Sequence, residues 1–339
     1  MPRERQTAGI RGPVAVAGDG GWGTALAILL HGKGVETRLW SREPGYAAEM
    51  RRTRANPRYL PGVALPEGIL VTGDVREAFA GAGLVVSAVP TQHLRATWGA
   101  LAPALPGRTP ILSVTKGIEN RTLERPTEIL AGVCGRRPLA VLSGPSHAEE
   151  VSRGLPAAVV AASRSHALAA AVQALFSTER FRVYRLADVV GVEFAGAAKN
   201  VVAIAAGITD GLGLGDNCKA ALITRGAVEM ARLGRALGAR AATFHGLAGM
   251  GDLIVTCASR HGRNRAVGER IGRGERLEDI LASTPMVAEG VPTARSLVDL
   301  ARRLAVEMPI AVEVHRVLHE GKDPRRALSD LMLRAPKRE

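Results

Sequence analysis

The 339-residue sequence has few cysteines and few aromatic residues. Its three cysteines are far apart and odd in number, which suits neither a disulfide framework nor a zinc site. This usage is typical of a reducing cytosol, so we expect a cytoplasmic protein without a metal site. Aromatic residues make up only 3% of the chain, so its cores must be built from Ala, Val, Leu and Ile.

The sequence also lacks long uncharged apolar runs. No stretch reaches the about 18 residues of a membrane span, and residues 1–12 are charged without the apolar segment of a signal peptide. We therefore expect a loose N-terminal tail and no membrane span. The net charge of +13 is compatible with nucleic-acid binding, but the basic residues are scattered and aromatic stacking platforms are missing. We expect no nucleic-acid partner.

Lysine is scarce, because arginine supplies most of the 45 basic residues. Arginine stays charged, whereas the pKa of lysine can be tuned so that it transfers a proton. A lysine inside an apolar stretch is therefore expected to be there for its own chemistry. The six lysines are Lys33, Lys116, Lys199, Lys219, Lys322 and Lys337.

A glycine-rich turn follows the first strand-like run, Val14–Ala17. Gly18, Gly20 and Gly23 form the pattern G-x-G-x-x-G, and the apolar helical stretch Thr24–Leu30 comes next. The order strand, glycine turn and helix is typical of a site for a dinucleotide pyrophosphate, which binds at the positive end of the helix dipole. The pattern alone is weak in a glycine-rich chain, but this context favours a dinucleotide site over an ordinary tight turn.

Strand-like runs alternate with helical stretches up to about Val183, which predicts a doubly wound parallel sheet. Beyond about Asp188 helical periodicity dominates, so a second, all-α domain is expected. The predicted organisation is a tail at 1–12, a Rossmann domain at 13–187, a helical domain at 188–333 and a tail at 334–339, with the active site in the cleft between domains. The predicted strands are Val14–Ala17, Val35–Trp40, Leu84–Ala88, Pro110–Ser113, Leu139–Leu142 and Ala157–Ala161.

The end of the second strand bears on the choice of cofactor. NAD enzymes usually place an acid about 20 residues after the glycines to bind the ribose hydroxyls, but this position holds Ser41 and Arg42, with Glu43 beyond. Arg42 suits the 2′-phosphate of NADPH, while Glu43 keeps NADH possible. We expect NADPH to be used at least as well as NADH.

Lys199 lies in the middle of the stretch Gly191–Ile208, which is apolar around its whole circumference and rich in small residues. Burying an unpaired ammonium is costly, so this lysine is expected to face a polar cleft as a proton donor or as a cation for an anionic ligand. The alternative is a structural ion pair with Glu193 or another acid.

Other candidate residues follow predicted strands or glycine turns. Lys116 comes just after a strand, Asp252 follows a glycine turn, and the Gly262–Arg265 segment is a polar loop entering a helix, which suits a phosphate. His315 and His319 are spaced like a metal pair, but without a third ligand we interpret them as surface residues of a helix.

Together these motifs resemble NAD(P)-dependent glycerol-3-phosphate dehydrogenases of the bacterial type. The resemblance runs collinearly from about Pro13 to Asp330. It rests on Gly18–Ala27, Arg58–Gly62, Ser113–Gly117, Ser143–Val151, Gly196–Ile208, Gly211–Met230, Gly249–Cys257 and Glu289–Val291.

The resemblance implies a Rossmann domain followed by a helical domain like the C-terminal domain of 6-phosphogluconate dehydrogenase. It implies a homodimer that reduces dihydroxyacetone phosphate to sn-glycerol 3-phosphate with NADPH or NADH, supplying phospholipid synthesis. Lys199 is the implied catalytic residue. The implied cofactor positions are Gly18, Gly20, Gly21, Trp22, Gly23, Arg42, Tyr59, Lys116, Ala148, Arg263, Val287 and Glu289. The implied substrate positions are Lys116, Gly144, Ser146, Lys199, Asp252, Gly262, Arg263 and Asn264.

Three positions depart from the family pattern. Asp19 stands where a small or neutral residue is usual, so its carboxylate is expected to point away from the pyrophosphate. Gly21 and Gly262 each replace a serine, which removes a side-chain contact. The competing interpretation is a related two-domain dehydrogenase of β-hydroxyacids, which would need a cationic clamp for a carboxylate. A non-catalytic nucleotide sensor would have no use for Lys199 in an apolar helix.

Overall fold

The computed structural model describes residues 9–284, 286–336 and 338, so the tails predicted at 1–12 and 334–339 lie partly outside the described residues. The chain divides into two compact units. Unit 1 comprises Met1–Lys116 and Arg125–Val192, and unit 2 comprises Gly117–Glu124 and Glu193–Glu339. The last boundary between the units along the chain therefore falls within the long helix α8, Val189–Gly211.

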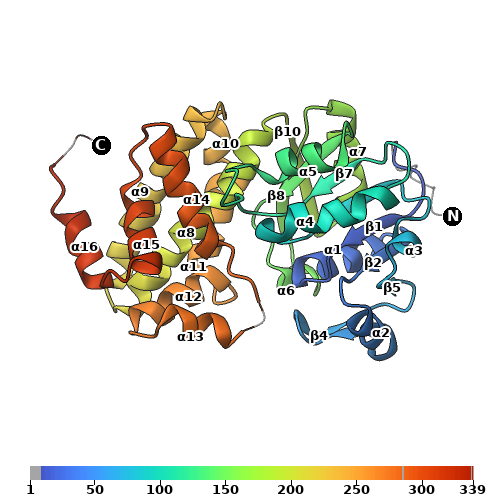
Figure 1. Ribbon diagram of the computed structural model, residues 1–339, viewed down its shortest axis with the longest axis horizontal. Coiled ribbons are helices and arrows are strands. Elements are labelled where there is room, and N and C mark those ends of the chain that lie inside the picture. Colours follow the sequence, from blue (N-terminus) through green and yellow to red (C-terminus); the bar gives the residue numbers. More distant parts are fainter. Residues whose placement is uncertain (1–8, 285, 337, 339) are drawn as a thin grey trace. The chain divides into compact units, whose positions relative to one another are not determined.

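Unit 1 is built on an eight-stranded sheet in the order β10-β9-β8-β7-β6-β1-β2-β5 (Figure 1). Most neighbours are parallel, but β9 pairs antiparallel with β8, so β9 and β10 run against the other strands. The strands are β1 (Val14–Ala17), β2 (Thr37–Trp40), β5 (Leu70–Thr72), β6 (Leu84–Ser87), β7 (Ile111–Ser113), β8 (Leu139–Ser143), β9 (Ala157–Ala162) and β10 (Phe181–Leu186). A separate antiparallel pair joins β3 (Ala55–Asn56) to β4 (Leu60–Ala64).

Helices cover both faces of this sheet, because alternate strand residues point to opposite sides. In β1, Val14 and Val16 join one core, and Ala15 and Ala17 join the other. The helices of unit 1 are α1 (Gly21–Gly32), α2 (Pro44–Thr53), α3 (Val75–Phe79), α4 (Thr91–Leu101), α5 (Pro126–Cys134), α6 (Ala148–Val151) and α7 (His166–Phe176), with a 3₁₀ turn at Ala102–Ala104. The first core packs under α1 and α7, and the second packs under α3, α4 and α5.

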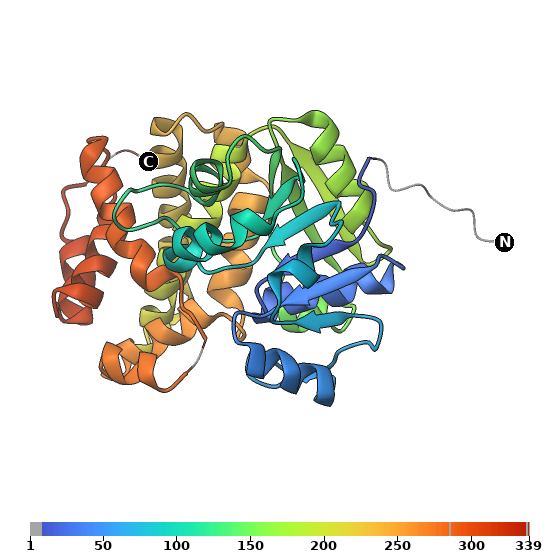
Figure 2. The ribbon, with the colours of Figure 1, turned by 45° about the vertical axis from the view of Figure 1, so that its right-hand side comes forward.

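Among its described residues, unit 2 contains helices and loops but no strand, and its helices are coloured yellow-green to red in Figures 1 and 2. The α/β sheet followed by an all-α region is therefore confirmed, and α8 contains the predicted helical stretch around Lys199. After α8 come α9 (Gly215–Ala236), α10 (Ala241–His245), a π-helical turn (Leu247–Gly251), α11 (Asp252–Ala258), α12 (Arg263–Gly272), α13 (Leu277–Ala282), α14 (Gly290–Arg303), α15 (Pro309–His319) and α16 (Pro324–Met332).

Among the described residues, only α8 has the length and composition of a membrane span, and 89% of its apolar window is buried inside the protein. Its apolar surface is therefore covered by the protein's own side chains, as in the core helix of a globular domain.

Glycines let α8 approach α12 backbone to backbone. A Cβ atom at Gly207 would lie 1.9 Å from the carbonyl oxygen of Arg265, and one at Gly268 would lie 2.0 Å from the carbonyl oxygen of Ile204. Gly211 and Gly272 meet one turn further along, where a Cβ on either would lie 2.9 Å from the other's Cα. The small residues of α8 thus hold the helix that carries Lys199 directly against α12.

Candidate active site

The glycine turn of unit 1 has the shape that a pyrophosphate site needs. Gly18 adopts a φ of +123°, and a Cβ there would lie 2.8 Å from the carbonyl oxygen of Ala88. A Cβ at Gly23 would lie 2.1 Å from the carbonyl oxygen of Gly18, so this glycine allows α1 to pack against the turn. A Cβ at Gly20 would meet no atom within 4 Å. The turn is therefore tightly packed except at Gly20, beside the N-terminus of α1, where an anion is favoured.

Gly21, the first residue of α1, is explained by its neighbours. A Cβ at this position would lie 2.5 Å from the carbonyl oxygen of Tyr59 and 3.6 Å from the Cβ of Ala148. A serine would push the Tyr59 backbone away, so the departure from the family pattern fits the structure. Tyr59 and Ala148, both predicted cofactor positions, therefore border the turn. Trp22 packs against Phe181, with 6.5 Å between ring centroids.

The ends of the first two strands are joined by an acid from the glycine turn. Ser41 directly follows β2, and its Oγ donates a 2.6 Å hydrogen bond to Oδ2 of Asp19. Burial raises the pKa of the Asp19 carboxyl, whereas the bond from Ser41 lowers it. Arg42 is exposed, and among the described residues it makes no hydrogen bond or ion pair. The Asp19 side chain is thus directed at the end of β2.

Three predicted substrate positions of unit 1 meet at one carbonyl group. The Nζ atom of Lys116 donates to the carbonyl oxygen of Gly144 at 3.1 Å, and the Ser146 Oγ donates to the same oxygen at 2.9 Å. Gly144 adopts a φ of +141°, and a Cβ there would lie 2.9 Å from the Cα of Val159. Glycine is therefore required at the point where this carbonyl faces Lys116.

In unit 2, Lys199 lies at the centre of a buried polar cluster. Its Nζ is 2.7 Å from Oδ1 of Asp252 and 2.6 Å from Oγ1 of Thr256. The side chains of Lys199 and Asp252 are 7% and 2% exposed. The Thr256 hydroxyl in turn donates to the Asp252 carbonyl oxygen at 2.6 Å. The ammonium group therefore has a fixed position and direction.

This ion pair bears on both interpretations of Lys199. The structural alternative requires an acid partner, and the structure supplies one, Asp252. The same contact is what an orienting residue makes, because it fixes the direction of the ammonium group. Asp252, an implied substrate position, therefore contacts Lys199 directly, as a residue that orients the ammonium would.

Arg263 and Asn264 begin helix α12, next to the same cluster. The Arg263 guanidinium donates to the carbonyl oxygen of Val287 at 3.0 Å, and Oδ1 of Asn264 accepts the Gly290 N–H at 2.9 Å. Glu289 precedes Gly290 at the start of α14. A Cβ at Gly262 would lie 2.8 Å from the carbonyl oxygen of Thr256, which accounts for glycine where the family has serine.

The structure thus groups the predicted residues within each unit. Those of unit 1 lie at the glycine turn, near the end of β2 and around the Gly144 carbonyl, and those of unit 2 surround Lys199 and the start of α12. Thr256 is a site residue that the sequence analysis missed. Its signal was available, because Asp252 and Thr256 are four residues apart and so share one face of α11.

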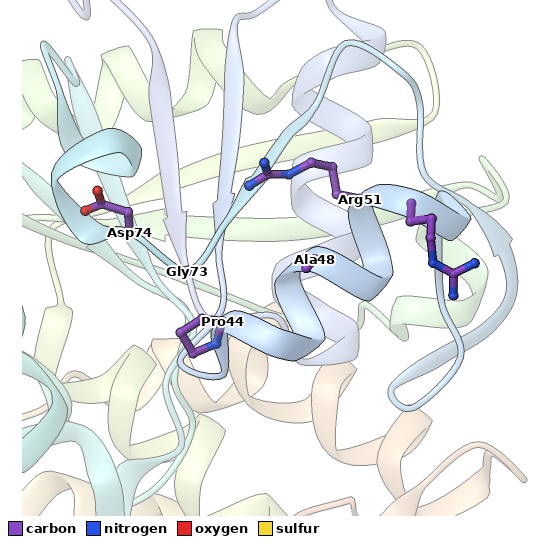
Figure 3. Close-up of a pocket in the computed structure, with 6 residues that line it drawn as sticks. Pro44, Ala48, Arg51, Gly73 and Asp74 are labelled. Carbon is purple, nitrogen blue, oxygen red and sulfur yellow. The ribbon is translucent and has the colours of Figure 1, made fainter.

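Two other features are formed by residues outside the predicted site. An open pocket of about 470 Å³ beside α2 is lined by none of the predicted site residues (Figure 3). Its lining residues are Pro44, Ala48, Arg51, Arg52, Gly73 and Asp74. His315 and His319 are half-buried, not surface residues as predicted. Nε2 of His319 lies 3.0 Å from the Val291 carbonyl oxygen.

Comparisons with known proteins agree with this arrangement. Residues 13–169 match the family described as NAD-dependent glycerol-3-phosphate dehydrogenase N-terminus, and residues 188–329 match its C-terminus. Glycerol-3-phosphate dehydrogenase (NAD(P)+) of Chlorobium phaeobacteroides strain BS1 is 49% identical over 329 residues, covering 96% of this chain and 98% of that protein. The corresponding protein of Geobacter sp. strain M21 is 50% identical over 329 residues, with the same coverage of both chains.

A solved structure shows the same fold. The crystal structure of glycerol-3-phosphate dehydrogenase from Coxiella burnetii superimposes with a TM-score of 0.93 at 39% identity, covering 96% of this chain and 100% of that one. Both family matches and the full-length relatives therefore cover the two units. The chain belongs to the NAD-dependent glycerol-3-phosphate dehydrogenase family.

Proposed function

We propose that this protein reduces dihydroxyacetone phosphate to sn-glycerol 3-phosphate with NADPH or NADH. The observation that carries the proposal is the buried Lys199 ammonium, held by Asp252 and Thr256 on a helix packed against the start of α12. Family membership and the names of the relatives support the same reaction.

The glycine turn of unit 1 fits a nicotinamide dinucleotide. The open side at Gly20 and the N-terminus of α1 would hold the pyrophosphate, and Tyr59 and Ala148 border it. Lys116, Arg263, Val287 and Glu289 complete the proposed cofactor set with Gly18, Gly21, Trp22, Gly23 and Arg42. When bound, the reduced nicotinamide supplies a hydride to the substrate ketone.

Lys199 supplies the proton that completes the reduction. As the carbonyl carbon gains a hydride, negative charge develops on its oxygen, and a nearby ammonium stabilises that charge and donates a proton to it. Asp252 and Thr256 hold Nζ so that it does not need to reorient during the step. We assign Lys116 to the substrate as well; its ammonium donates to the Gly144 carbonyl oxygen, to which Ser146 also donates.

The start of α12 binds the phosphate of the substrate. A helix N-terminus favours an anion, and Arg263 adds a guanidinium that can donate two hydrogen bonds to it. Asn264 and the backbone at Gly262 complete this end of the site. Anchoring the phosphate places the ketone in a fixed position near Lys199, which makes the reaction effectively intramolecular.

A spectrophotometric assay tests the proposal. Oxidation of NADPH and of NADH is followed at neutral pH with dihydroxyacetone phosphate and, in parallel, with a panel of β- and α-ketoacids. The proposal expects turnover with the phosphorylated ketone and little with the acids. Turnover confined to a ketoacid would favour the related β-hydroxyacid dehydrogenase instead.

We further propose that the protein is a cytoplasmic homodimer that supplies glycerol 3-phosphate for phospholipid synthesis. Family resemblance supports these points. Sedimentation equilibrium of the full chain tests the dimer, for which a single species of monomer mass would be the contrary result.

A further inference from the structure

The carboxylate of Asp19 occupies an unusual place in the dinucleotide site. NAD enzymes of this fold usually supply an acid from the end of the second strand, and that acid binds the ribose 2′-hydroxyl. Here Ser41 stands at that place, fully buried, with its N–H bonded to the carbonyl oxygen of Thr72 at 3.0 Å. Its Oγ donates to Oδ2 of Asp19 at 2.6 Å. An acid from the glycine turn thus reaches the end of β2.

Buried hydrogen bonds fix the backbone of Asp19 as well. Its carbonyl oxygen accepts a bond from Nδ2 of Asn56 at 2.7 Å and another from Oγ1 of Thr24 at 3.1 Å. Asn56 and Thr24 are each 1% exposed and are bonded to each other at 2.8 Å. The Asp19 carboxylate is consequently held at a defined position by the protein's own hydrogen bonds, which is what a specificity contact requires.

The carboxylate retains accepting capacity. Among the described residues, Ser41 is the only other residue that donates to it. Arg58, whose positive charge acts on this carboxyl group, is paired with Glu43 at 3.0 Å and lies 3.9 Å above the Tyr46 ring. Asp19 therefore presents a negative charge that no adjacent arginine neutralises directly.

We propose that Asp19 is a specificity-determining residue that favours NADH over NADPH, in opposition to Arg42. Its carboxylate accepts a hydrogen bond from the ribose 2′-hydroxyl and repels a 2′-phosphate at the same place. Arg42, exposed and without an ion pair among the described residues, attracts that phosphate. Selectivity between the cofactors then depends on the balance between attraction of the 2′-phosphate by Arg42 and its repulsion by Asp19.

This inference rests on the proposed dinucleotide binding, so the test measures binding without turnover. Dissociation constants of the full chain for NADH and NADPH are obtained from nicotinamide fluorescence at fixed ionic strength. Asp19→Asn keeps the size of the side chain and removes its charge. It is expected to shift the ratio of the two constants toward NADPH by about tenfold. Arg42→Ala is expected to shift the ratio in the opposite direction.

Ser41→Ala separates this role from a structural one, because it removes the hydrogen bond to Asp19 but leaves the carboxylate charged. The ratio is expected to stay within about twofold of the unaltered protein. If Asp19→Asn weakened or strengthened both dinucleotides equally, Asp19 would be only a structural partner of Ser41 and the inference would be overturned. If the unaltered protein bound neither dinucleotide, the proposed function itself would fail.

Discussion

The Nζ atom of Lys199 lies 2.7 Å from Oδ1 of Asp252, although the two residues are on different helices and both side chains are buried. A buried pair of this kind is a weak source of stability, because desolvation of the two charges offsets most of their attraction. The role of this ion pair is to position the Lys199 ammonium group within an otherwise apolar helix.

Replacing Lys199 with methionine is expected to lower kcat by about a hundredfold or more, since positioned proton transfer typically contributes ~10²–10⁴. The measurement is steady-state oxidation of the reduced cofactor with saturating dihydroxyacetone phosphate. Lys219→Met is the matched control, because its ammonium pairs with a different acid, Asp210, at 2.8 Å. Near-normal turnover of the Lys199 variant would contradict its assignment.

Asp252→Asn is expected to lower both activity and stability. Removing one partner leaves a buried ammonium without its countercharge, which typically costs about 3–5 kcal/mol. Urea denaturation measures the loss. The double variant Lys199→Met with Asp252→Leu should recover most of the stability and none of the activity. If Asp252→Asn unfolded at the same urea concentration as the unaltered protein, the pair would not be buried as described.

Gly268→Ala is expected to destabilise unit 2, because its new methyl group would lie 2.0 Å from the Ile204 carbonyl oxygen. Overpacking of this kind typically costs about 1–3 kcal/mol, and more where backbone must move. Gly99→Ala is the control. Gly99 lies in the exposed part of α4 with nothing within 4 Å of a Cβ, and the change should stabilise by about 0.5–1 kcal/mol. Equal melting temperatures for the two variants would rule out close contact between α8 and α12.

A buried carboxylate should make stability depend on pH. Glu229 on α9 accepts the N–H groups of Ile310 and Ala311 at the start of α15, at 2.9 and 3.4 Å. Burial raises its pKa to about 7, although these bonds and the positive charges of Arg232 and Arg334 lower it. The folded protein therefore holds a proton here at pH values where the unfolded chain has released it.

The difference in bound protons between the folded and unfolded states decides whether stability rises or falls with pH. Since the folded state binds more protons between the ordinary pKa of glutamate and about 7, this group's stabilising contribution is complete at low pH and is lost as the pH rises through about 7. The full effect is about 3 kcal/mol. Glu229→Gln keeps an acceptor for Ile310 and should flatten the pH profile of unfolding between pH 5 and 8, as measured by urea titration at each pH. An unchanged slope would exclude Glu229 as its source.

Strands that are short, wholly buried apolar runs could be predicted from the sequence, whereas strands with a weaker pattern were missed. Val14–Ala17 and Leu84–Ser87 are short, wholly buried apolar runs between turns, so their positions were predictable. The strand Leu70–Thr72 has only three residues, too few for a periodic signal. In Phe181–Leu186 buried Phe181 and Val183 alternate with exposed residues, and this period of two is a signal that the analysis overlooked.

The direction of strands depends on contacts that lie far apart in sequence. The strand predicted at Ala157–Ala161 is expected in a parallel sheet, but the observed strand Ala157–Ala162 pairs antiparallel with Leu139–Ser143. A buried apolar strand looks the same in either direction, so composition alone could not decide this. The partner of Lys199 was equally hidden, because Asp252 lies 53 residues further along the chain. The unusual setting of Lys199, in contrast, was visible from its apolar neighbours alone.

The glycine contacts between α8 and α12 have a consequence for substrate choice. No side chain intervenes at Gly207 and Gly268, so main-chain geometry sets the spacing between the Lys199 helix and α12, whose start we propose to bind the substrate phosphate. In the proposed reaction, that spacing fixes the distance that the substrate must have between its ketone and its phosphate. We therefore expect ketone phosphates with one more carbon between these groups to be poor substrates, because backbone contacts and not side chains set this spacing.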